Sequence, residues 1–119
     1  MQILYANYVT NNIDDLDKAW MADETFMLLP ERYCVQDIWI EKAIKQLPDS
    51  FREGHFALLT SGSTGFPKLV FGEKSRSENL TEILFVAQDS NLVEKILLCL
   101  PLSYCYAFVN QWLLARKFK

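Results

Sequence analysis

Apolar and polar residues alternate along the first half of the chain at spacings that change between strand-like and helical. Residues 2–10 contain a short apolar stretch that predicts a strand. Residues 11–21 begin with two asparagines, which suit a helix start, and then place apolar side chains at helical spacing. A second strand is predicted over residues 25–29 and a second helix over residues 32–47, before a polar turn at residues 49–54.

The second half of the chain continues this alternation. Two apolar runs, residues 55–60 and 68–71, flank a loop of small polar residues and therefore predict strand, loop and strand. Residues 75–89 begin with the spacing of a capping box and predict a helix that packs over the sheet. Its expected apolar face consists of Leu80, Ile83, Leu84 and Ala87. The nearly continuous apolar run 93–102 predicts a strand covered on both faces, followed by an amphipathic helix with basic residues at its end.

Alternating strands and helices predict an α/β fold, with a layered mixed sheet and flanking helices. The length of 119 residues suits one domain, to which residues 1–54 contribute helices and short strands and residues 55–119 the remaining elements. Hydrophobic residues make up 50% of the chain and charged residues 23%, which indicates a globular protein rather than a disordered one.

Charge and hydropathy argue against nucleic-acid and membrane partners. The formal net charge of −3 gives no support for binding to nucleic acid or to an anionic membrane. Residues 96–115 contain no charged residue and are about long enough to span a bilayer, but a proline and several polar residues interrupt them. A strand, a break and a buried helix therefore explain this stretch better than a membrane span.

The cysteines and the start of the chain indicate a compartment. Cys34, Cys99 and Cys105 are odd in number and lie in apolar contexts, so they predict buried thiols in a reducing environment rather than disulfides. The first ten residues lack the basic start and the cleavage site of a signal peptide. These observations predict a cytoplasmic location.

The most distinctive stretch is the loop between the two predicted strands, where residues 58–68 read Leu-Leu-Thr-Ser-Gly-Ser-Thr-Gly-Phe-Pro-Lys. Glycines allow positive φ, so that backbone N–H groups can converge, while hydroxyls donate to the same oxygens and a lysine adds charge. This combination predicts a phosphate-binding loop, although a solvated hairpin loop without a ligand is the alternative. The candidate residues are Thr60, Ser61, Gly62, Ser63, Thr64, Gly65 and Lys68. The spacing differs from that of the Walker loop, because Phe66 and Pro67 separate the last glycine from the lysine.

Residues 60–68 resemble the phosphate-binding signature of the adenylate-forming superfamily, which includes acyl-CoA synthetases, luciferases and the adenylation domains of peptide synthetases. That signature usually reads Thr/Ser-Ser-Gly-Thr/Ser-Thr-Gly-x-Pro-Lys, and this chain matches every fixed position. Residues 100–107 resemble a second family segment, usually Pro-Leu-x-His-x-Phe/Tyr-Gly, which lines the acyl-substrate pocket of relatives. Here Tyr104 stands in place of the histidine and Ala107 in place of the glycine. The resemblance implies that Tyr104 positions the substrate through its neutral phenol, whereas packing at a helix start is the alternative.

The resemblance implies a two-step ligase reaction. A carboxylic acid attacks the α-phosphorus of Mg²⁺-bound ATP, which gives an acyl-adenylate and pyrophosphate, and a thiol such as coenzyme A then displaces AMP. The loop would hold the β- and γ-phosphates, and Lys68 would stabilise the departing pyrophosphate as a catalytic cation. The family's later motifs, such as the Thr-Gly-Asp segment, do not occur in this sequence. We therefore expect an amino-terminal portion of a ligase that is inactive by itself.

Two alternatives remain at this point. The chain could be a non-catalytic module that binds phosphate or nucleotide, or an assembly module that self-associates through unpaired sheet edges and uncovered apolar surface. His55 is the only histidine, and we expect a structural or solvent-exposed role for it rather than a catalytic one. The sequence contains no Cys-x-x-Cys pair, so no metal site made of protein nitrogen and sulfur is expected.

Overall fold

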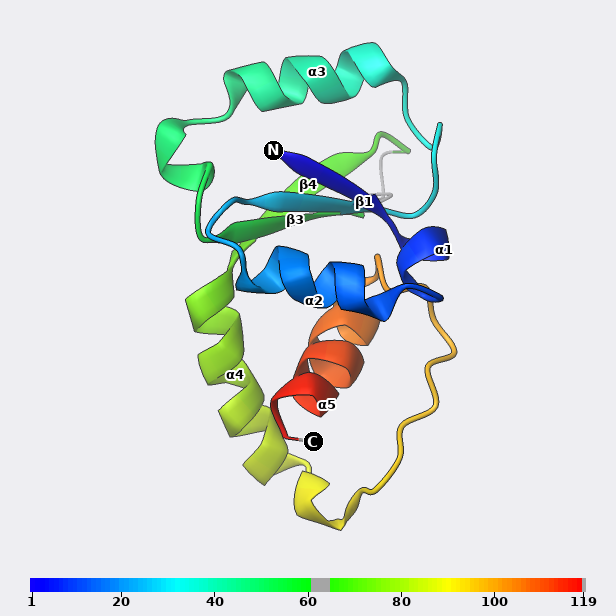
Figure 1. The fold of residues 1–119 in the computed structure, drawn as a ribbon, viewed down its shortest axis with the longest axis vertical. Coiled ribbons are helices and arrows are strands. Elements are labelled where there is room, and N and C mark those ends of the chain that lie inside the picture. The colour runs from blue at the N-terminus through cyan, green and yellow to red at the C-terminus, as the bar shows by residue number, and fades with distance from the viewer. Residues whose placement is uncertain (61–64, 119) are drawn as a thin grey trace.

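The computed structural model describes residues 1–60 and 65–118, and it is built around a four-stranded sheet with helices on both faces (Figure 1). The strands lie side by side in chain order: β1 (Gln2–Tyr5), β2 (Phe26–Leu29), β3 (His55–Thr60) and β4 (Lys68–Glu73). β1, β2 and β3 are parallel, and β4 pairs antiparallel with β3. The predicted α/β class, with a mixed sheet and flanking helices, is confirmed.

The helices connect and extend this sheet. They are α1 (Ala6–Val9), α2 (Ile13–Met21), α3 (Asp37–Gln46), α4 (Lys74–Ala87), the π-helix η3 (Tyr106–Leu113) and α5 (Leu114–Lys117), with short 3₁₀ turns η1 (Asp49–Phe51) and η2 (Ser90–Leu92). The predicted helix over residues 11–21 is confirmed, whereas the one predicted from residue 32 begins only at Asp37. The reason is local, because Tyr33 has a φ of 65°, in the left-handed region that a right-handed helix cannot include.

The core is organised around β2, in which all four residues are buried. Successive side chains of a strand point to opposite faces of the sheet. Accordingly, Phe26 and Leu28 pack against α2 and η3, whereas Met27 and Leu29 pack on the other face in the cluster that includes Ile40 of α3. The sheet therefore separates two apolar layers, and Figure 1 shows α2 and α3 on its opposite sides.

A buried lysine joins the sheet to the start of α4. The Nζ atom of Lys74 donates hydrogen bonds to the carbonyl oxygens of Ala19 at 3.0 Å, Ala22 at 2.7 Å and Glu24 at 3.0 Å. It also lies 5.3 Å from the centre of the Phe26 ring. Burial lowers the pKa of Lys74, against the opposing effect of nearby carboxylates. The ammonium thus satisfies carbonyl groups at and just beyond the end of α2 that the helix itself leaves unpaired.

The strand predicted over residues 93–102 is wrong. Residues 93–99 adopt no regular structure and form the extended connection that leads from η2 towards η3 (Figure 1). Leu97 is 83% exposed. A buried strand needs a neighbouring strand for its backbone hydrogen bonds, and this segment joins neither edge of the sheet. The apolar character of this segment is therefore not enough to make it a strand of the sheet.

The predicted packing of α4 is wrong in part, since only Leu84 of the expected apolar face packs against the core. The helix begins at Lys74, and the Ser75 hydroxyl donates to the Glu73 carboxylate at 2.9 Å, so no capping box forms. Leu80 and Ile83, expected on the apolar face, are exposed, whereas the buried positions are Lys74, Ser77 and Thr81. The helix runs away from the sheet and packs beside η3 and α5 (Figure 1), which explains why a different face is covered.

The three cysteines and the helix predicted after residue 102 differ in how well the sequence predicts them. Cys34 is partly buried, but Cys99 and Cys105 are exposed, so the prediction of buried thiols is wrong for these two; all three are free. The predicted helix after residue 102 is present as η3 and α5, and it buries Phe108 and Leu113. Within the described ranges, no helix combines the length and apolar character needed to cross a membrane.

Candidate phosphate-binding site

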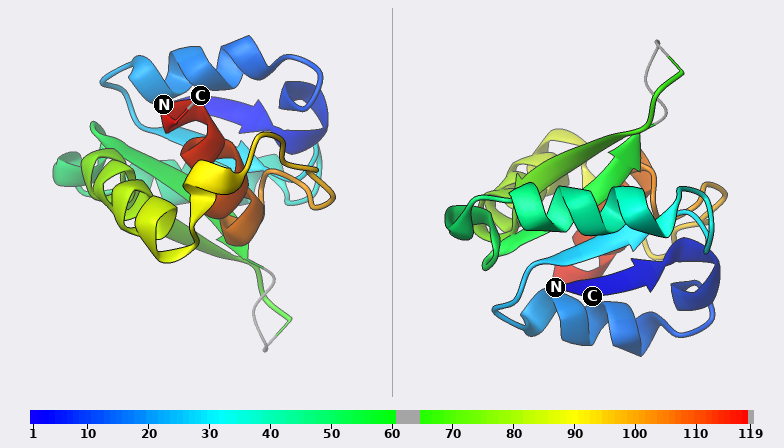
Figure 2. Two further views of the ribbon diagram at one scale, coloured as in Figure 1. Left: turned by 90° about the horizontal axis from the view of Figure 1, so that it is seen from below. Right: turned by 90° about the horizontal axis from the view of Figure 1, so that it is seen from above.

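The predicted strand, loop and strand form an antiparallel hairpin. Thr60 at the end of β3 is paired with Lys68 at the start of β4, and the Thr60 Oγ1 atom lies 3.4 Å from the Lys68 carbonyl oxygen. The carboxyl end of β3 and the start of β4 extend beyond the flanking helices (Figure 2). Ser61, Gly62, Ser63 and Thr64, which complete the predicted phosphate loop, lie outside the described residues.

A hollow of about 290 Å³, here called the hairpin hollow, lies at the base of this loop. Its lining residues are Pro30, Cys34, Leu59, Thr60, Gly65, Pro67 and Tyr104. Three of them, Thr60, Gly65 and Tyr104, are candidate residues from two separate motifs of the sequence. Gly65 has a φ of +78°, the left-handed conformation for which the loop needs a glycine. The structure therefore brings described parts of both motifs to one place.

Lys68 and Tyr104 have different positions relative to the hollow. Lys68 is exposed and is not among the lining residues. Its side chain lies on the same face of the sheet as that of Thr60, because directly opposite residues of an antiparallel pair share a face. Tyr104 is 51% exposed and contributes to the wall of the hollow. Its carbonyl oxygen accepts a hydrogen bond of 2.9 Å from the Phe108 N–H, which fixes its backbone at the start of η3.

Pro30 and Cys34 complete the hairpin hollow, although no motif in the sequence points to them. Pro30 directly follows β2, and β2 is parallel to its neighbour β3, so both strands end at the same edge of the sheet. Ligands of open α/β sheets bind outside this carboxyl edge. Pro30 and Cys34 could have been predicted only from the pairing of β2 with β3, and the sequence pattern does not reveal that pairing.

His55 lies at the opposite end of β3 from Thr60. Its Nδ1 atom is 2.7 Å from the Glu53 carbonyl oxygen, and its ring centre is 4.8 Å from that of Phe51. These contacts give the histidine a structural environment away from the hairpin hollow. Among residues 1–60 and 65–118, no group of three His, Cys, Asp or Glu side chains comes together in a way that could hold a metal ion.

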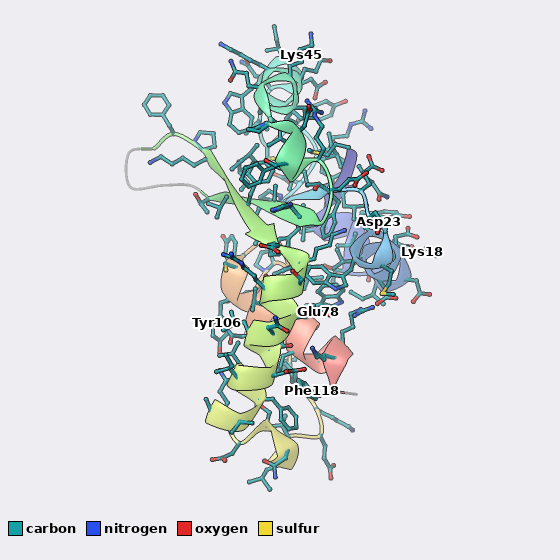
Figure 3. The ribbon with its side chains drawn as sticks, turned by 90° about the vertical axis from the view of Figure 1, so that its left-hand side faces the viewer. Lys18, Asp23, Lys45, Glu78, Tyr106 and Phe118 are labelled. Carbon is teal, nitrogen blue, oxygen red and sulfur yellow. The ribbon has the colours of Figure 1, made fainter. Side chains whose placement is uncertain are left out.

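Glu78 of α4 is the centre of a separate charged cluster, where α4 faces α5 (Figure 3). Its Oε1 atom accepts a hydrogen bond of 2.8 Å from the Trp20 indole and lies 3.8 Å from the Arg116 guanidinium. Arg116 also pairs with Asp17 of α2. This cluster borders a hollow of about 590 Å³. Because these charged groups pair with one another, they connect α2, α4 and α5.

Comparison with known proteins adds no assignment, since no family model, curated protein or solved structure matches this chain.

Proposed function

We propose that this chain binds the phosphates of ATP beside the hairpin hollow and forms part of an AMP-forming carboxylic acid ligase of the acyl-CoA synthetase type. One observation supports the proposal most directly: Thr60, Gly65 and Tyr104 line the same hollow. The first two belong to the segment that resembles a phosphate loop, and the third belongs to the segment that resembles an acyl-substrate wall.

The chemistry of these residues suits the first, adenylate-forming step. Negative charge moves onto the departing pyrophosphate during this step, and donors that are already oriented stabilise it without reorganisation. We assign this donor role to the Thr60 hydroxyl, the backbone amides near Gly65 and the Lys68 ammonium. The Tyr104 phenol can donate a hydrogen bond to the carboxylate of the acid. Mg²⁺ would arrive bound to the phosphates of ATP, and coenzyme A would enter in the second step.

The proposal is tested by titrating the full chain with MgATP and with pyrophosphate in a calorimeter. We expect weak binding of pyrophosphate, with a Kd on the order of 0.1–1 mM, because one loop supplies only part of the contacts to the nucleotide. Lys68→Ala should weaken this binding about tenfold or more, since it removes the loop's ammonium. Lys42→Ala on α3 removes an equally exposed charge and should leave it unchanged.

Two results would reject parts of the proposal. Equal affinities of Lys68→Ala and the unaltered chain would remove Lys68 from the site. Absence of any binding of MgATP and pyrophosphate to the unaltered chain would reject its phosphate-binding role. In a ligase that contains this segment, loss of one such donor should slow ATP–pyrophosphate exchange on the order of 10²-fold.

Self-association is a second candidate role, and the exposed apolar surface favours it. Ile83 and Val86 on α4 and Leu92 and Leu97 beyond it are all more than half exposed. β4 is also the last strand of the described sheet, so its outer edge can pair with another chain. Static light scattering should then show a mass that rises with concentration. A constant monomer mass up to high micromolar concentration would reject this role.

A further inference from the structure

The outer face of α4 carries a row of exposed apolar residues, here called the α4 stripe. Its members recur at steps of three and four residues, the spacing of one helix face, and they are Leu80, Ile83, Val86 and Ala87. Ile83 is 65% exposed and Val86 is 75% exposed. Figure 3 shows α4 with no other described helix or strand in front of it. The stripe is therefore an apolar helix face that no described element covers.

The covered face of α4 is partly polar. Ser77 and Thr81 are buried, and the Thr81 hydroxyl donates to the Glu78 carbonyl oxygen at 2.6 Å, while Leu84 supplies a contact with the core. A surface helix normally turns its apolar side inward and its polar side to water. Here a continuous set of apolar side chains lies on the outward side instead. Exposed apolar patches of this kind mark surfaces that bind another protein.

The charges at the two ends of the α4 stripe differ in sign. Arg76 precedes the stripe with a side chain that is 85% exposed, and its Nε atom lies 3.0 Å from the Glu73 carboxylate, so the guanidinium has further N–H donors. Asp89 follows the stripe, is exposed, and takes part in no ion pair among the described residues. An antiparallel second copy of α4 would place its Asp89 beside Arg76, whereas a parallel copy would oppose like charges.

We propose that the α4 stripe binds the same stripe of a second copy of this chain, in an antiparallel pair around a twofold axis near Ile83. This inference rests on the self-association role proposed above and names the surface that carries it. The two Ile83 side chains meet at the axis, and Leu80 of each copy packs against Val86 of the other. The 14 residues of α4 span about 21 Å, so one helix pair buries less than a standard interface of about 1,600 Å² and gives a weak dimer.

Sedimentation-velocity ultracentrifugation of the full chain measures this pairing. The unaltered chain should change from monomer towards dimer between about 10 and 500 μM. Ile83→Glu should weaken the dimer about tenfold or more, because it places two carboxylates at the axis. Two matched controls introduce the same charge elsewhere and should leave the dimer unchanged: Leu97→Glu at an exposed apolar residue outside the stripe, and Val70→Glu on the edge strand β4. All three positions are exposed, and circular dichroism checks that each variant is folded.

A double-mutant cycle tests the antiparallel direction. Arg76→Glu should weaken the dimer about threefold or more, because the new carboxylate faces Asp89 of the second copy. The same change should have much less effect in the background of Asp89→Asn, since asparagine also accepts the left-handed backbone at this position, where φ is 49°. Equal weakening in both backgrounds would overturn the antiparallel pairing.

The remaining outcomes separate this inference from the self-association role on which it rests. A dimer that tolerates Ile83→Glu overturns the assignment to the α4 stripe and leaves self-association standing. If Val70→Glu alone disrupts that dimer, the contact lies at the edge of β4. A chain that stays monomeric over the whole concentration range overturns both proposals.

Discussion

The sheet and the helical extension of this molecule use their apolar residues in opposite ways. In the sheet, β2 is completely buried, and aromatic rings from α2, β2, β3 and η3 cluster on one face. In the extension, formed by α4 and residues 88–100, Val86 is 75% exposed and Leu97 83% exposed. Hydrogen bonds and ion pairs such as those of Glu78 attach α4 to its neighbours, together with Leu84 at the edge of the core and Phe85 stacked on Phe118. Extensive hydrophobic burial therefore stabilises the sheet, whereas the extension has only a few apolar contacts and a set of polar contacts to the helices beside it.

The largest predicted effect compares one buried side chain from the sheet with one exposed side chain from the extension. Phe26→Ala removes a fully buried ring and should lower the free energy of unfolding by about 3–5 kcal/mol. Leu97→Ala should change it by less than about 0.5 kcal/mol, because little area is lost from contact. Urea unfolding followed by tryptophan fluorescence measures both. Similar losses for the two variants would mean that residues 93–99 are buried in solution.

The next effect concerns the junction between the two regions. Lys74→Met keeps the length of the side chain but removes an ammonium that pairs with three carbonyl oxygens, so the free energy of unfolding should fall by about 2 kcal/mol. The exposed Lys95 provides the matched control, and Lys95→Met should be nearly neutral. If Lys74→Met proves as stable as the unaltered chain, the cost of desolvating the ammonium cancels the gain from its hydrogen bonds.

A smaller effect tests how tightly β3 and β4 pack. A Cβ atom added at Gly72 would lie 2.5 Å from Cζ of Phe56, directly opposite it in the sheet. Gly72→Ala should therefore cost about 1–2 kcal/mol through overpacking. In the background of Phe56→Leu, which removes the ring, the same substitution should cost much less. Additive losses in the two backgrounds would contradict a direct clash between these residues.

These residues also show which features the sequence can predict. The hairpin at Thr60 and Lys68 and the helix α2 are encoded locally, by turn residues and by periodicity, and the structure confirms them. The role of Lys74 is not visible in the sequence, because a lysine at a helix start usually points to solvent. The run 93–102 fails for a related reason: its pattern describes side chains, while a strand also requires a partner in space. Pro30 and Cys34 join the hairpin hollow only through the pairing of β2 with β3.

The smallest effect on stability is expected at Lys68, the proposed phosphate-binding lysine. A loss of binding without a loss of stability would show that this residue serves function rather than folding. Lys68 is exposed at the start of β4, and no ion pair of its side chain is found among the described residues. Lys68→Ala should therefore change the free energy of unfolding by less than about 0.5 kcal/mol. Under the proposed function, the same substitution should weaken pyrophosphate binding about tenfold, because it removes the positive charge that we assign to phosphate binding. A loss of stability as large as that of Lys74→Met would instead assign Lys68 to the framework of the hairpin, and weaker binding by this variant would then reflect a disturbed loop.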